Sequence, residues 1–230
     1  MLRECNFNDI SDGHTYGLND MVRLDTDGCS GCHKCCTGMG QSIILDPFDI
    51  WRMKTCAYET RVSFETLIQT GKIELNLVDG LILPNLRMNE NDACSFLNEN
   101  GRCSIHAARP SVCRLFPLGR VYDENGFSYF LQKDECAKEV RAKMKVKKWI
   151  DTDNIREQEI FVLAWHNFIR MTGSRMIALR KRGTSEIMNE IAIYVLNTFY
   201  VKDVEVSEDA KAYRNLVEMI REATKKIEIL

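Results

Sequence analysis

The spacing of ten cysteines constrains this 230-residue chain more than any other feature of its sequence. Eight of them form a series in which four thiols lie within the stretch CSGCHKCC and four follow at wider intervals. The series consists of Cys29, Cys32, Cys35, Cys36, Cys94, Cys103, Cys113 and Cys136. Cys5 and Cys56 lie outside it. If these thiols act together, the fold must bring distant segments to CSGCHKCC.

The redox state of the thiols depends on the compartment. The first twenty residues lack the apolar run of a secretory signal, and no segment is apolar over the length of a membrane span. We therefore expect a cytoplasmic protein with no membrane partner. Reducing compartments keep thiols out of disulfides, so clustered cysteines there serve metal binding or catalysis. The formal net charge of −2 argues against a nucleic-acid partner.

The spacing within CSGCHKCC is typical of a metal-binding loop. Two cysteines separated by two residues can turn both sulfur atoms toward one centre, as in zinc knuckles and iron–sulfur loops. The third cysteine at this spacing favours a cubane [4Fe–4S] cluster, because zinc sites more often draw their second pair from a distant segment. Zinc remains the alternative cofactor.

The adjacent pair Cys35 and Cys36 is unusual in a ligand set. Neighbouring side chains on extended backbone point to opposite faces, so both reach one ion only from a distorted loop. Either the two thiols divide between two centres, or one of them is not a ligand. The eight thiols suffice for two four-coordinate sites, or for one cluster with spare thiols, and the sequence does not decide between these arrangements.

Cations and histidines lie close to the cysteines in sequence. Arg102, Arg109 and Arg114 are each within four residues of a core cysteine and can offset thiolate charge. We take Arg109 and Arg114 as candidate cofactor-binding residues. His33 and His106 can each replace a thiol as ligand, although packing roles are commoner for such residues.

No catalytic residue is identifiable. The chain lacks a phosphate-loop motif, a dinucleotide fingerprint and an evident nucleophile–histidine pair. Whether it is an enzyme stays open.

Local patterns predict the elements of the first half. We expect short strands in MVRLD and QSIILD, a helix over 47–56 with Asp46 as N-cap, and a helix in SFETLIQTG that ends at Gly71. Alternating apolar residues on both sides of Asp79-Gly80 predict a hairpin with a type I′ turn. Two shorter hairpins are expected to turn at Asn100-Gly101 and Asn125-Gly126.

The C-terminal part has helical spacing instead. Helical spacing begins at about Val146, and we expect one helix that includes Ile155, runs to Lys181 and is ended by Gly183. Two more helices are expected in TSEIMNEIAIYVLNTFY and SEDAKAYRNLVEMIREATKKI. The basic run RAKMKVKKW, residues 141–149, is most simply a solvated helix face, and its other interpretation is contact with an anionic partner.

These patterns predict an α+β fold that is mainly α. An irregular cysteine-rich metal-binding core with short β-hairpins would be covered by the C-terminal helices. We divide the sequence into a lead-in (1–20), a cysteine-cluster core (21–137) and a C-terminal helical region (138–230).

The cysteine blocks resemble a known family. C-x2-C-x2-C-C followed by CSFL…GRCSIH…RPSVCRLFP is similar to the YkgJ-type cysteine-cluster family, which is described as chelating zinc or iron. The resemblance covers roughly residues 22–137. It implies that the eight cysteines of the series are the family's cysteines, and it marks Arg109, Pro110, Arg114 and Pro117 as motif positions. Flagellin lysine N-methylases, which are longer, are similar in the cysteine block and are associated with an iron–sulfur cluster and methyl transfer.

Three functional hypotheses follow from the residues and the resemblance. The first is an iron–sulfur protein that is redox-active or supports modification of a protein or peptide. The second is a structural zinc module that binds a partner protein through its helices. The third is metal storage or delivery, which requires a solvent-accessible Cys35 or Cys36.

Overall fold

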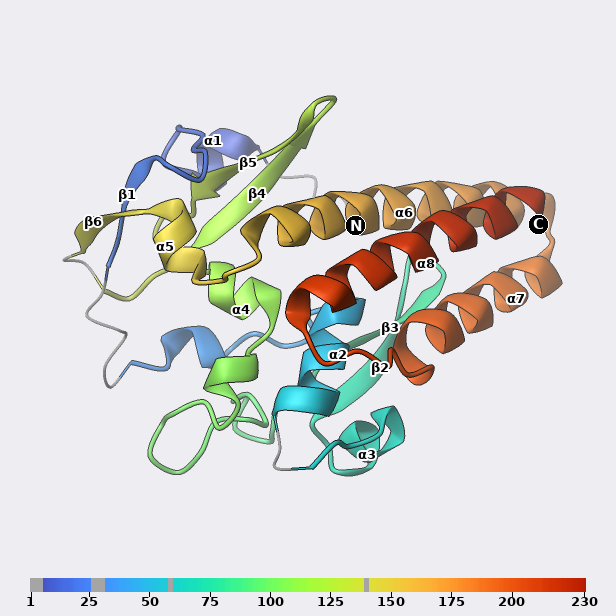
Figure 1. Ribbon diagram of the computed structural model, residues 1–230, viewed down its shortest axis with the longest axis horizontal. Coiled ribbons are helices and arrows are strands. Elements are labelled where there is room, and N and C mark those ends of the chain that lie inside the picture. Colours follow the sequence, from blue (N-terminus) through green and yellow to red (C-terminus); the bar gives the residue numbers. More distant parts are fainter. Residues whose placement is uncertain (1–5, 26–31, 58–59, 139–140) are drawn as a thin grey trace. The chain divides into compact units, whose positions relative to one another are not determined.

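The computed structural model describes residues 6–25, 32–57, 60–138 and 141–230 (Figure 1). The chain forms two compact units whose segments alternate along the sequence. The cysteine unit comprises Met88–Ile155 and the described residues before Gly40. The helical unit comprises Gly40–Arg87 and Arg156–Leu230. The three-part division at residues 20 and 137 is a division of the sequence and stays a prediction.

The cysteine unit is built from short elements. Its helices are α1 (Phe7–Ile10), α4 (Ser111–Leu115) and α5 (Val146–Ile150), with 3₁₀ turns at Lys34–Cys36 and His106–Ala108. Strand β1 (Met21–Asp25) pairs with β6 (Ala142–Lys145), and β4 (Leu118–Asp123) pairs with β5 (Gly126–Leu131), both antiparallel.

Alternation along β1 places one of its faces in the core of this unit. Val22 and Leu24 are buried, whereas Met21 and Arg23 are exposed. The core consists of Val22, Leu24, Leu115, Leu118, Tyr129, Val146 and Ile150. The indole N–H of Trp149 donates to the carbonyl oxygens of Leu115 and Phe116, at 3.2 and 3.1 Å. These two bonds satisfy carbonyl oxygens at the end of α4, the helix that contains Cys113.

The helical unit contains the long helices. They are α2 (Pro47–Cys56), α3 (Phe64–Gln69), α6 (Ile155–Arg182), α7 (Ser185–Leu196) and α8 (Asp209–Ile229), with a π-helical turn at Asn197–Val201. Strands β2 (Ile73–Val78) and β3 (Leu81–Leu86) form its hairpin, and α7 lies against β3. Phe48 of α2 stacks on Tyr213 of α8, with ring centroids 3.7 Å apart.

Most local predictions are confirmed, and so is the mainly α, α+β class. Helix α2 has the predicted bounds, and its capping box is complete. The Asp46 side chain accepts a hydrogen bond from the N–H of Asp49 at 2.8 Å, and the Asp49 side chain accepts one from the N–H of Asp46 at 3.2 Å. Asp79 and Gly80 have φ of 52° and 88°, as a type I′ turn requires. Gly183, with φ of 73°, follows α6 directly.

Three local predictions differ from the structure. The segment QSIILD makes a single bridge, Ile44 with Asn85, in place of a strand. The turn at Asn100-Gly101 is flanked by one bridge, Leu97 with Cys103, in place of a hairpin. The basic run forms β6 and then α5, because its first residues find a pairing partner in β1. Among the described residues, no helix combines the length and hydrophobicity needed to cross a membrane.

Candidate metal centre

Two loops of the same construction carry Cys94 and Cys103. In the first loop, the side-chain oxygen of Asn89 accepts hydrogen bonds from the N–H groups of Asn91 and Ala93, at 2.9 and 3.0 Å. The backbone N–H of Asn89 donates to the carbonyl oxygen of Ala93 at 2.7 Å. An asparagine that bonds the backbone ahead of it fixes a tight turn. The next residue, Cys94, is therefore held at a defined position.

The second loop repeats these contacts. The side-chain oxygen of Asn98 accepts from the N–H groups of Asn100 and Arg102, at 3.1 and 2.9 Å, and the N–H of Asn98 donates to the carbonyl oxygen of Arg102 at 2.9 Å. The equivalent fourth residues, Asp92 and Gly101, both adopt left-handed backbone, with φ of 54° and 68°. We call these two segments, 89–93 and 98–102, the asparagine loops.

The sequence contains a signal for these loops. NENDACS at 89–95 and NENGRCS at 98–104 share five of seven residues. The ligand set was predicted from cysteine spacing alone, so this short repeat was missed. Neither Asn89 nor Asn98 was among the predicted site residues, although each positions one of the predicted thiols.

The segment with Cys35 and Cys36 pairs with the first asparagine loop. The N–H of Cys94 donates to the carbonyl oxygen of Cys36, and the N–H of Gly38 donates to the carbonyl oxygen of Asp92, both at 2.8 Å. Two backbone bonds in opposite directions fix the register between the segments. Cys36 of the first predicted group of thiols and Cys94 of the later group are therefore backbone neighbours.

His33 contacts the second asparagine loop. A Cβ atom added at Gly101 would lie 3.0 Å from Nδ1 of His33, so the imidazole ring packs directly over this glycine. The contact gives the exposed His33 a packing role against the second asparagine loop. A role of His33 as a ligand stays a prediction.

The thiols of Cys35 and Cys36 lie on a 3₁₀ turn, so the expectation for extended backbone does not apply to them. The turn brings the two side chains into a hydrogen bond. This bond lowers the pKa of Cys35 to about 7, and the positive charge of Arg109 acts in the same direction, while partial burial opposes both. The same bond, followed by burial, raises the pKa of Cys36.

Thiols from three other segments lie near this pair. The pKa of Cys36 is also raised by its proximity to Cys113 and Cys94. The pKa of Cys103 is raised chiefly by burial and in part by Cys35, while Arg109 acts to lower it. Together these interactions connect the five-thiol cluster, which consists of Cys35, Cys36, Cys94, Cys103 and Cys113.

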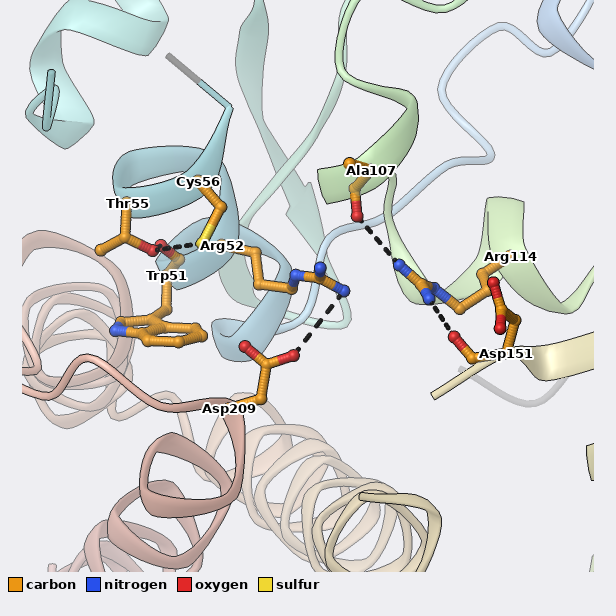
Figure 2. A network of polar contacts seen from close by, with 8 residues as sticks. All are labelled: Trp51, Arg52, Thr55, Cys56, Ala107, Arg114, Asp151 and Asp209. Atoms are coloured by element: carbon orange, nitrogen blue, oxygen red, sulfur yellow. Dashed lines mark hydrogen bonds and ion pairs between the residues drawn. The ribbon is translucent and has the colours of Figure 1, made fainter. Parts of the chain in front are cut away.

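Arg114 fixes the helix that contains Cys113. Its Nη1 donates to the carbonyl oxygen of Asp151 at 2.5 Å, and its Nη2 donates to the carbonyl oxygen of Ala107 at 3.1 Å (Figure 2). These bonds link α4 to the preceding 3₁₀ turn and to the residue after α5. Arg114 is thus a positioning residue for α4, and its contact with a cofactor stays a prediction.

Arg109 contacts His106 and lies near two of the thiols. Its Nη1 is 2.7 Å from Nε2 of His106. Burial, then Arg109, Arg102 and Arg114, lower the pKa of His106, so the ring is neutral at pH 7. Because a guanidinium only donates, Nε2 of His106 is the acceptor and is already engaged. The positive charge of Arg109 near Cys35 and Cys103 agrees with the predicted cofactor-binding role, which stays a prediction.

The other cysteines contribute less to this geometry. Cys32 and Cys136 are half-buried, and their membership of the ligand set stays a prediction. Cys29 lies outside the described residues. Cys56 is exposed at the end of α2, in the helical unit, with its Sγ 3.3 Å from Oγ1 of Thr55 (Figure 2). None of the eight described cysteines is in a disulfide.

The donor set fits a soft metal centre by its chemistry. Thiolates are the preferred ligands of iron–sulfur clusters and of structural zinc. The cluster contains five cysteine thiols, which would lose their protons on binding metal, and a guanidinium lies nearby to offset the resulting charge. In the part of the chain that the structure describes, no three Cys, His, Asp or Glu side chains already have an arrangement that could hold a metal ion. The thiols therefore fit a metal by the type of their donor atoms and by their proximity to one another.

Comparison with models of known protein families decides which family the chain belongs to. The model of a family named after its CxxCxxCC motif matches residues 28–148, which is more than half of the chain. The chain belongs to the CxxCxxCC family. This family is described as a proposed zinc- or iron-chelating domain, so metal binding, with zinc or iron as cofactor, is assigned at the level of the family. No curated protein and no solved structure matches the chain.

The CxxCxxCC match covers every segment that builds the centre. It contains the Cys35–Cys36 turn, both asparagine loops and α4. It ends at residue 148, within α5, and excludes Arg156–Leu230 of the helical unit. The resemblance seen in the cysteine blocks is thus confirmed for the chelating domain, whereas the long C-terminal helices are not part of the match.

Proposed function

We propose that this CxxCxxCC protein holds an iron–sulfur cluster that is redox-active or supports modification of a protein or peptide. The five-thiol cluster carries the proposal. One zinc ion in a closed site takes four ligands, whereas five thiols interact here and three more belong to the same sequence series. The C-x2-C-x2-C spacing supports the same choice, since iron–sulfur loops use such repeated spacing.

The residues of the chain have separable tasks under this proposal. The five-thiol cluster would hold the centre together with thiols among Cys29, Cys32 and Cys136. A bound iron–sulfur cluster supplies one-electron transfer. Arg109 offsets negative charge near Cys35 and Cys103. Arg114 and the asparagine loops keep the thiol-bearing segments in place.

The exposure of Cys35 favours a second candidate function, metal storage or delivery. Transfer between proteins needs an accessible thiolate, and Cys35 is exposed with a pKa lowered to about 7. Metal bound for delivery would exchange readily. A structural zinc module for partner binding, the remaining alternative, would hold zinc tightly and show no colour.

Anaerobic purification tests the proposal. Iron, zinc and acid-labile sulfide would be measured per chain, together with the visible spectrum. We expect iron with equimolar sulfide and broad visible absorption. Colourless protein with tightly held zinc, and no iron uptake after anaerobic reconstitution, would contradict the proposal in favour of the zinc module. Metal lost rapidly to a mild chelator, without sulfide, would favour delivery.

A further inference from the structure

The basic run forms an exposed surface of the cysteine unit that the metal centre does not use. Lys143 and Lys145 lie on β6 and are exposed, and Lys147 and Lys148 are exposed on α5. Arg23 of β1 lies directly opposite Lys143 in the register of the two strands and is exposed as well. We call these five cations the basic face.

The hydrogen-bond pattern shows which pairs of the ladder lie closest. The N–H of Val146 donates to the carbonyl oxygen of Asp20 at 3.1 Å, so in an antiparallel ladder the alternate pair Val22–Met144 is also hydrogen-bonded. The pairs Arg23–Lys143 and Met21–Lys145 are then non-hydrogen-bonded pairs, whose side chains lie nearest to each other. Two like charges therefore lie directly opposite one another, which destabilises an isolated sheet.

The described part of the chain does not offset this charge with an ion pair. Its salt bridges involve none of the five cations of the basic face. Asp20, in the adjoining turn, uses its carboxylate to accept the N–H of Gly17 at 2.8 Å. An external anion would offset the repulsion between these like charges.

We propose that the basic face binds an acidic segment of a partner protein, which lies in extended conformation along β6. Among the described residues, β6 pairs with β1 alone, so its opposite edge has no strand beside it. Lys143 and Arg23 form a non-hydrogen-bonded pair, and the backbone N–H and C=O of Lys143 therefore point toward that opposite edge. An added strand can use that edge. Lys143 and Lys145 are two residues apart, roughly 7 Å along a strand, which matches alternate side chains of such a segment.

The two faces of β6 differ, so a partner strand beside it should alternate two kinds of side chain. Acidic side chains at every second position would form opposite-charge cross-strand pairs with the two lysines. The side chains between them would lie on the side of Met144, which packs against the core of the cysteine unit. An extended segment that alternates acidic and apolar residues therefore fits.

Fluorescence anisotropy on the full chain tests the proposal. The probe is a labelled ten-residue peptide of alternating glutamate and valine, compared with the same peptide carrying glutamine for glutamate. We expect the glutamate peptide to bind, with affinity that falls as salt rises, and the glutamine peptide not to bind. The double variant K143E/K145E should weaken binding by at least about tenfold.

Two further variants separate binding from folding. K181E/K225E makes the same charge change at exposed positions of the helical unit and should bind as the wild type does. Arg23→Gln removes the like-charge pair, so we expect it to weaken peptide binding while the melting temperature is maintained or raised. Circular dichroism checks the fold of each variant.

Three results would overturn the proposal. One is failure of the wild type to bind the glutamate peptide. Another is unchanged affinity in folded K143E/K145E or in Arg23→Gln. The third is tighter binding of a single-stranded oligonucleotide or of vesicles containing anionic lipid through the same lysines, which would assign the basic face to nucleic acid or to a membrane surface.

Discussion

Burial sets the protonation of His166, a half-buried side chain on α6. Its pKa is lowered to about 4, first by burial and then by the charge of Arg170. An unfolded chain protonates histidine near pH 6.5. Between pH 6.5 and 4 the unfolded state therefore binds a proton that the native state does not. The contribution of His166 to the free energy of unfolding is fully present above this window. It is lost as the pH drops through the window.

The substitution His166→Gln should remove this pH dependence. After allowance for partial exposure, we expect the wild type to lose about 1–2 kcal/mol more than the variant between pH 7 and pH 4.5. Urea denaturation at a series of pH values measures the difference, and comparison of the two proteins cancels the contribution of every other titrating group. Parallel stability curves for the two proteins would show that His166 does not titrate as described.

At the scale of elements, the asparagine loops are the devices that present thiols. Each uses one amide oxygen to accept two backbone N–H groups, and each is followed directly by a cysteine. Loss of that oxygen leaves two donors without their acceptor and frees the loop. The asparagine itself need not touch metal for its loss to affect metal binding.

Substitution Asn98→Ala should therefore affect both stability and metal content. We expect a loss of about 1–2 kcal/mol of unfolding free energy, from two hydrogen bonds, and less metal bound per chain. Asn100→Ala is the matched control, since it makes the same change in the same loop, where only the backbone N–H of residue 100 is used. We expect this control to stay within about 0.5 kcal/mol of wild type. Equal effects of both substitutions would show that the amide oxygen of Asn98 does not organise the loop.

Elements with a local cause were predictable from the sequence, and those with a distant partner were not. Asp46 and Pro47 specify the start of α2, and Asp79-Gly80 specifies a turn, because the determining contacts lie within a few residues. Strand β6 instead depends on pairing with β1, far away in sequence, and its lysine spacing alone does not reveal this partner. Cysteine spacing pointed to the thiols that lie near one another here, but the asparagine repeat gives no such signal, because Asn89 and Asn98 act through backbone hydrogen bonds and are not metal-ligand residue types.

At the scale of the whole molecule, the two units are interleaved in sequence. Cys35 and Cys36 precede Gly40–Arg87, and the later cysteines follow it, while that segment itself folds in the helical unit. A metal bound by both groups of thiols would close the chain on either side of the segment. Metal binding should therefore stabilise the folded chain, because the site forms only when the segments before and after Gly40–Arg87 are both in place.

The central claim is that thiols from four segments share one metal centre. The most direct test is the metal content, per chain, of four single variants purified anaerobically: Cys36→Ser, Cys94→Ser, Cys103→Ser and Cys113→Ser. Cys56→Ser is the control, because Cys56 lies in the helical unit and outside the five-thiol cluster. We predict that each of the four loses most of its bound metal while Cys56→Ser keeps the wild-type amount. Full metal content in Cys94→Ser and Cys113→Ser would contradict the claim.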